Sequence, residues 1–233
     1  MKNIFFLIFL FVSSEVLCQI KSGSIEYSVT FTKDKELETG MLANYYKDAK
    51  NNAKFLSYLL DFDDKRMVFY VNEKLKSDSS ENLDFVEAFS DANGKYFREK
   101  NSSLILNEIE NSIVGHLIVK SEIILDWNLI NETKMIDSYL CFKATADLNI
   151  KNSSGIFKRK IIAWYCPKIP FSYGPKGFGN LPGLILQLQE RNVIFGAKKI
   201  NLNKDLRALI KPAKVKIIGQ DEYSKILNST APK

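Results

Sequence analysis

Residues 139–166 read YLCFKATADLNIKNSSGIFKRKIIAWYC, and this stretch predicts a β-hairpin. Apolar and polar side chains alternate over residues 139–148, which is the period of a half-buried strand. Residues 151–155 read KNSSG and supply the turn, because Asn, Ser and Gly accept the backbone angles that a reversal needs. A second strand is expected over residues 157–166.

The hairpin also brings two of the three cysteines together. If the chain reverses at the Ser153–Ser154 bond, Cys141 lies directly opposite Cys166. Cα atoms in such a pair can lie about 4.5 Å apart, which is within disulfide range. We therefore expect a Cys141–Cys166 disulfide, and the alternative is two buried free thiols. Two thiolates and the distant His116 give an incomplete zinc shell, so no metal site is predicted.

Period-two alternation recurs along the rest of the chain, and short turns separate its segments. No strand–helix–strand rhythm is present, so the strands should be antiparallel. The predicted fold is mainly β (β-rich α+β): a single curved antiparallel sheet, an open barrel or bowl with few short helices, partly plugged by one helix. Further strands are expected at residues 25–31, 56–62, 67–71, 96–99, 104–109, 117–130 (with an interruption), 184–190 and 193–200. Helical signals are confined to residues 79–89 (ambiguous), 206–211 and 221–227.

Residues 1–18 have the organisation of a secretory signal peptide. A basic start precedes an unbroken apolar run at residues 4–12, which is too short to span a bilayer as a helix. Leu17 stands before Cys18, where a lipoprotein signal has a small residue, so we expect soluble release with Gln19 as the first residue. The chain is then exported, either periplasmic or secreted or associated with the outer membrane, as a single domain over residues 19–233 with no membrane span after processing.

The composition excludes several classes of protein. Among 233 residues, 45% are apolar, and 11 Gly and 6 Pro are too few for a fibrous or low-complexity chain. The formal net charge is +6, and aromatic residues do not interleave with the basic stretch 198–216, so no nucleic-acid partner is expected. One His and three Cys leave little for metal or imidazole chemistry, which favours a non-enzyme without cofactors.

Residues 166–183, here called the glycine–proline loop, read CPKIPFSYGPKGFGNLPG and hold four of the 11 Gly and four of the 6 Pro. The spacing of Gly177, Gly179 and Gly183 imitates a dinucleotide fingerprint, but Pro182 removes a donor amide and a strand, rather than a helix, follows. Ser172 stands in no nucleophile elbow. The loop therefore predicts a defined shape rather than a phosphate or catalytic site.

The loop and its flanks resemble the GLPGLI family of exported Bacteroidetes proteins. The resemblance rests on Ala163-Trp164-Tyr165, Ile169-Pro170, Gly174, Pro175, Gly177, Phe178, Gly179, Asn180, Leu181, Pro182, Gly183, Leu184, Ile185 and Leu186, and extends to Cys141–Ala144, Pro212–Ile217 and Glu222-Tyr223. Asn180 replaces the family's usual Gly, and Cys166 replaces a non-cysteine residue. The resemblance implies an exported β-rich envelope protein, similar in shape to bowl-like accessory domains of secreted enzymes, with no established activity.

The leading functional prediction is an exported, non-catalytic binding or accessory protein of the cell envelope. Rigid aromatic side chains beside a preformed loop bind at low entropic cost, so the candidate anchors are Trp164, Tyr165, Tyr173 and Phe178; the alternative is that they only pack the loop onto the sheet. The expected partner is an envelope protein, a peptide or an apolar ligand. Two other functions stay open: an envelope hydrolase of carbohydrate or peptide using Glu122 and Asp126, and a periplasmic carrier of apolar ligands.

Overall fold

The computed structural model describes residues 20–73, 83–152, 155–203 and 209–230. The predicted signal peptide and its cleavage site lie outside these residues. So do the first part of the ambiguous helix at 79–89 and part of the one expected at 206–211; residues 209–211 are not helical.

One 12-stranded sheet forms the body of the described chain. Its spatial order is β12-β6-β5-β4-β3-β2-β1-β11-β10-β9-β8-β7, and every neighbouring pair is antiparallel except β12 with β6. The strands are β1 (Ser22–Phe31), β2 (Ser57–Asp63), β3 (Arg66–Val71), β4 (Lys95–Glu99), β5 (Leu104–Asn111), β6 (Gly115–Glu122), β7 (Asn128–Ile136), β8 (Tyr139–Asn152), β9 (Gly155–Cys166), β10 (Leu184–Glu190), β11 (Val193–Leu202) and β12 (Ile217–Gly219).

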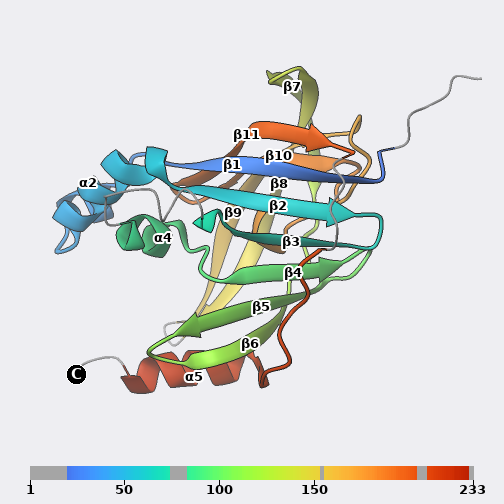
Figure 1. Ribbon diagram of the computed structural model, residues 1–233. Coiled ribbons are helices and arrows are strands. Elements are labelled where there is room, and N and C mark those ends of the chain that lie inside the picture. The colour runs from blue at the N-terminus through green and yellow to red at the C-terminus, as the bar shows by residue number, and fades with distance from the viewer. Residues whose placement is uncertain (1–19, 74–82, 153–154, 204–208, 231–233) are drawn as a thin grey trace, which may run out of the picture.

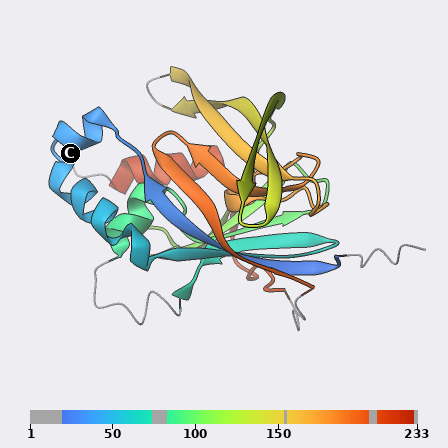
Figure 2. The same cartoon turned by 90° about the horizontal axis from the view of Figure 1, so that it is seen from above.

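The sheet is strongly curved but not closed, since β12 and β7 form its two edges. In Figure 1, β8 and β9 run behind β2–β5 at a steep angle to them. Figure 2 shows the same curvature from above, with β1 and β11 joining the two halves. The predicted fold class, a mainly β open bowl, is confirmed.

The predicted hairpin is confirmed in its register. Phe142 pairs with Tyr165, and Asn152 pairs with Gly155, which is the register that the sequence predicts. Both strands are longer than predicted, because the polar turn residues continue the ladder. The interruption expected within residues 117–130 is present and separates β6 from β7. The edge strand β12 was not predicted, because three residues are too few to show an alternating pattern.

The described residues include few helices. They are α1 (Lys35–Thr39), α2 (Ala43–Asn52), α4 (Asp84–Ser90) and α5 (Gln220–Thr230), with 3₁₀ turns η1 (Ala53–Phe55) and η2 (Pro175–Gly177). Helices α2 and α4 lie together at one end of the sheet, and α5 lies beside β6 (Figure 1). The C-terminal helix is confirmed. The sequence does not predict α1 and α2, because only Tyr46 and Ala49 of α2 are buried and α1 buries no residue. No helix of the described residues is long and apolar enough to cross a membrane.

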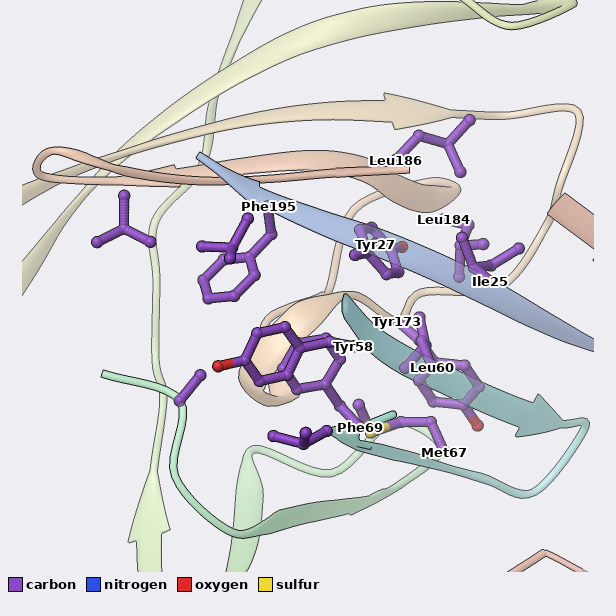
Figure 3. Packing of buried hydrophobic residues seen from close by; sticks show 14 of the residues in the cluster. Ile25, Tyr27, Tyr58, Leu60, Met67, Phe69, Tyr173, Leu184, Leu186 and Phe195 are labelled. Carbon is purple, nitrogen blue, oxygen red and sulfur yellow. The ribbon is translucent and has the colours of Figure 1, made fainter. Parts of the chain in front are cut away.

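Aromatic side chains dominate the core on the inner, concave face. Tyr58 stacks on Phe69 with ring centroids 5.2 Å apart, and Phe195 meets both rings edge-on. The hydroxyl of Tyr27, which is buried, donates to the carbonyl of Ile185 at 2.6 Å. Figure 3 shows these rings between β1, β2 and β3, with Tyr173 of the glycine–proline loop among them.

Candidate functional site

The glycine–proline loop lies inside the bowl. Phe171 and Tyr173 are buried in the main core, and the ring of Phe171 lies 4.7 Å from that of Phe62. On the opposite wall, the side chain of Ile105 in β5 packs directly against Gly177. A helical plug was expected here, and that expectation is wrong: this loop occupies the interior instead. The room that a carrier of apolar ligands would need is therefore taken by the loop.

Arg98 on β4 fastens the loop to the sheet. Its side chain, 4% exposed, donates from Nε to the carbonyl of Ser102 at 2.6 Å and from Nη1 to the carbonyl of Gly177 at 2.8 Å. Its Nη2 donates to the Oδ1 of Asn180. Burial lowers the pKa of this guanidinium from its usual value, although it remains a cation at neutral pH.

Asn180 stands where the motif that the loop resembles usually has Gly. Its backbone has a φ of 63°, in the left-handed region that Gly adopts freely and that Asn adopts more readily than most residues. Because its side chain also accepts a hydrogen bond from Arg98, the substitution adds a contact that Gly lacks.

A buried ion network fixes the other side of the loop. The ammonium of Lys176 lies 2.7 Å from Glu190 Oε2 and 3.3 Å from Asp91 Oδ2, and Arg159 pairs with the second oxygen of Glu190. The side chains of Lys176 and Glu190 are only 9% and 7% exposed. Burial alone would raise the pKa of Glu190, but Lys176 and Arg159 outweigh it and hold that pKa below its usual 4.5.

This network makes stability depend on pH. Because the folded pKa of Glu190 is depressed, its stabilisation is present above pH 4.5 and is lost as the pH falls through the folded pKa. Burial lowers the pKa of Lys176, but Glu190 and Asp91 raise it by more, so the contribution of Lys176 is lost only at strongly alkaline pH. We expect the urea midpoints of wild type and Glu190→Gln to differ at pH 7 and to converge as the pH falls from 4.5 through the folded pKa of Glu190. A difference that stays constant down to pH 3 would contradict this assignment.

The four candidate anchors are not gathered on one surface. Tyr165, Tyr173 and Phe178 are buried, at 6%, 1% and 1% exposure, so they pack the loop and the sheet against each other in this conformation. Trp164 is partly exposed, and Lys134 lies 4.2 Å from the centre of its ring. Trp164 alone among the four reaches solvent as a partly exposed aromatic surface.

Truncating the buried aromatic residues should cost more than truncating the partly exposed one. We expect Phe178→Ala and Tyr173→Ala to lose about 3–5 kcal/mol in urea unfolding, and Trp164→Ala clearly less. The hydroxyl of Tyr173 is buried and has no hydrogen-bond partner within the described chain, so Tyr173→Phe should be neutral or stabilising. A loss for Tyr173→Phe as large as that for Tyr173→Ala would show that the hydroxyl, not the ring, holds the loop.

The two cysteines adjoin in the hairpin, as expected, but the structure has them as free buried thiols. The thiol of Cys141 donates to the carbonyl of Tyr139 at 3.6 Å. The interaction between the two thiols raises the pKa of Cys141 and lowers that of Cys166. The nearby backbone N–H groups of Lys168 and Ile169 also lower the pKa of Cys166, and the N–H of Ile169 donates to the carbonyl of Cys166 at 3.1 Å. The predicted bridge is therefore not formed in this structure, although the register of β8 and β9 is the one that it requires.

A polar pocket of about 200 Å³ stays open on the inner face beside the loop. It lies between the inner faces of β4–β6 and the first turns of α5, with Lys176 at its edge. We call this site the polar pocket, and its polar lining consists of Asp91, Asn93, Tyr96, Asn107, Ser121, Lys176, Gln220 and Tyr223.

Hydrogen-bonding groups dominate the polar pocket, while its charges cancel. The two charged residues of the lining, Asp91 and Lys176, pair with each other. Burial raises the pKa of Tyr96 and of Tyr223, so both phenols stay protonated and can donate hydrogen bonds. The pocket thus offers amides and hydroxyls, with Ile109 and Val119 as its apolar floor. Such a site can hold an uncharged polar group.

The residues considered for hydrolysis lie elsewhere. Glu122 ends β6 and Asp126 lies in the segment that leads to β7, and both are exposed. Next to them, Trp127 donates from Nε1 to the carbonyl of Gly179 at 2.9 Å, so it braces the loop. His116 pairs with Glu108 at 3.0 Å on the outer face. Within the described residues no group of three or more His, Cys, Asp or Glu side chains could hold a metal ion.

Comparisons with known proteins match part of the chain by sequence and most of it by shape. The family model described as "Protein of unknown function (Porph_ging)" matches residues 127–187, which include β7–β9 and the glycine–proline loop. No curated protein matches the sequence.

Two solved structures of PNGF-II, in the C2 and P21 space groups, have a similar fold. Their TM-scores are 0.55 and 0.52 at 12% and 11% identity, over 89% and 88% of this chain. These alignments cover only 32% and 33% of the PNGF-II chains, so the chain spans about a third of their length.

Proposed function

We propose that this chain is an exported, GLPGLI-type binding or accessory protein of the cell envelope, and that it binds an uncharged polar ligand in the polar pocket. The observation that carries the proposal is the balance of charge in that pocket: the pair of Asp91 and Lys176 belongs to a network with Glu190 and Arg159 that holds two carboxylates and two cations, among amide and hydroxyl groups. A ligand with a net charge would have to break this pair, whereas a neutral ligand would not.

The size of the pocket narrows the choice of ligand. A volume of about 200 Å³ corresponds to roughly seven water molecules at ~30 Å³ each, which is the room for one sugar ring or one peptide unit. Groups that both donate and accept hydrogen bonds, on Asn93, Ser121 and Gln220, suit hydroxyl and amide groups equally. The phenol rings of Tyr96 and Tyr223 add flat apolar surface of the kind that sugar rings contact.

The accessory role rests on the fold and the expected export. A fold like that of this chain makes up about a third of the longer PNGF-II chains, so this shape occurs as one part of a larger protein. The signal peptide expected at residues 1–18 supports a periplasmic or secreted location, and the match at residues 127–187 supports the GLPGLI resemblance.

Export also favours oxidation of the cysteine pair. In an oxidising compartment we expect Cys141 and Cys166 to form a bridge, since the register of β8 and β9 places them next to the paired residues Phe142 and Tyr165. It would close a loop of about 25 residues and stabilise the fold by roughly 3 kcal/mol in the chain-entropy model. Alkylation of exported, denatured and unreduced protein should label neither cysteine. Labelling of both would show that the thiols stay reduced.

Ligand-observed NMR with a panel of neutral mono- and disaccharides and uncharged dipeptides tests the binding. Wild type should bind at least one member, and Ser121→Trp, which fills the polar pocket, should abolish that binding. Ser229→Trp, on the exposed side of α5, is the matched control and should bind as wild type does. Binding that persists in Ser121→Trp, or no binding by wild type, would contradict the proposal.

A further inference from the structure

A second cavity lies at a step in the sheet, away from the polar pocket. Strand β9 pairs with β8 from Gly155 onward, but it pairs with β10 only over Ile161–Cys166. The start of β9 therefore projects beyond the turn that joins β10 to β11. A cavity of about 480 Å³ fills this step, and we call it the cationic notch. Its lining includes Phe157, Lys158, Lys160, Ile162, Gln189 and Arg191.

Every charged residue that lines the cationic notch is a cation. Arg159, also in the lining, is committed to Glu190 of the buried network. Arg191 lies 3.7 Å from Asp34, and its side chain is 53% exposed. Within the described chain, Lys158 and Lys160 make no ion pair within 4 Å, although Asp147 stands across the ladder from Lys160. The notch thus carries a positive charge that its own surroundings leave largely uncompensated.

Apolar side chains lie beside these cations. Phe157 is 49% exposed, and Ile150 and Ile162 also line the notch. A half-exposed aromatic ring and two branched aliphatic side chains suit a hydrocarbon segment, whereas the ammonium groups suit an anion. Its volume falls in the range of small-molecule clefts, so a headgroup and the start of a chain fit together.

We infer that the cationic notch binds an anionic amphiphile, a molecule with a phosphate or carboxylate head and a hydrocarbon chain. The head pairs with Lys158, Lys160 and Arg191, and the chain lies on Phe157 and its aliphatic neighbours. The site is on a different part of the molecule from the polar pocket and does not depend on the function proposed for it. The same chemistry exists in a free single-chain amphiphile and in an anionic bilayer.

Dodecyl phosphate below its critical micelle concentration and vesicles of phosphatidylglycerol in phosphatidylcholine distinguish the two sources. Wild type should bind dodecyl phosphate monomers, sediment with the anionic vesicles, or both, and salt should weaken the binding. Monomer binding alone would identify a soluble ligand, and sedimentation would identify a membrane surface. A neutral amphiphile with the same chain should bind at least tenfold more weakly, by roughly 1.4 kcal/mol.

Matched double variants assign the binding to the notch. Lys158→Gln/Lys160→Gln should lower the affinity about tenfold, and Lys198→Gln/Lys199→Gln, which removes the same charge from β11, should lower it much less. All four lysines are exposed, so both variants should keep the wild-type circular dichroism spectrum. Equal losses of affinity in the two double variants would show that binding depends only on the net charge of the protein, and would overturn the assignment to the notch. Absence of binding to either probe would also overturn it.

Discussion

Gly183→Ala is expected to destabilise the protein by about 3 kcal/mol, which lowers the melting temperature by roughly 6–12 °C for a chain of this size. Gly183 has a φ of 152°, which side chains rarely adopt. A Cβ at this position would lie 2.3 Å from the carbonyl oxygen of Cys166 and 2.7 Å from the nitrogen of Pro167. Both are backbone atoms where β9 ends, so neither can move without displacing the loop.

Substitutions at two other glycines distinguish the steric clash of the added Cβ from the strain of a positive φ. At Gly219 an added Cβ meets nothing within 4 Å, so Gly219→Ala should be close to neutral. Gly115 has equal space but a φ of 69°, so Gly115→Ala should lose about 1 kcal/mol from backbone strain alone. Thermal unfolding of the three variants measures this order. A Gly183→Ala protein as stable as Gly115→Ala would show that the loop is not packed against β9 as described.

Glu190→Ala is expected to lose about 3–5 kcal/mol, because it leaves the buried ammonium of Lys176 without its nearest carboxylate. The exposed carboxylate of Asp91, 3.3 Å away, compensates only in part. Replacing the pair by Lys176→Met/Glu190→Leu removes both charges and fills similar volume, so it should recover most of the loss. Urea unfolding of Lys176→Met, Glu190→Leu and the double variant gives the coupling energy of the pair.

An exposed ion pair provides the control for this cycle. Lys143 and Glu132 are 2.8 Å apart, but the side chain of Glu132 is 53% exposed. Glu132→Ala should therefore lose no more than about 1 kcal/mol. If Glu190→Ala costs no more than Glu132→Ala, the network does not fix the loop.

Local patterns predicted most of the sheet, because each strand carries its own alternation. Strand β10 begins and ends at the predicted residues, and the hairpin of β8 and β9 has the predicted register. The short helix α1 buries none of its side chains, so its sequence carries no apolar period. Edge strand β12 is three residues long and depends on its neighbour β6, which a local pattern cannot show.

The site was harder to predict, because it depends on contacts between distant segments. The alternation of β4 places Arg98 on the same face as Tyr96, which is a sign of a buried cation, but its two acceptors in the loop lie about 80 residues further along the chain. Lys176 and Glu190 are ordinary charged residues in sequence, and only the folded loop brings them together. The four candidate anchors stand out in the sequence because they are large and aromatic. Three of them, Tyr165, Tyr173 and Phe178, are buried, because large aromatic rings fill the interior of the bowl.

Amide chemical-shift mapping tests the central claim, that the loop is a packed interior element and the polar pocket is the binding site. The probe is the pool of neutral saccharides and uncharged dipeptides, added to uniformly ¹⁵N-labelled protein. We expect shift changes at Asn93, Tyr96, Ser121 and Gln220, with the amides around Trp164 unchanged. Changes centred on Trp164 and its strand, or no changes at all, would contradict it.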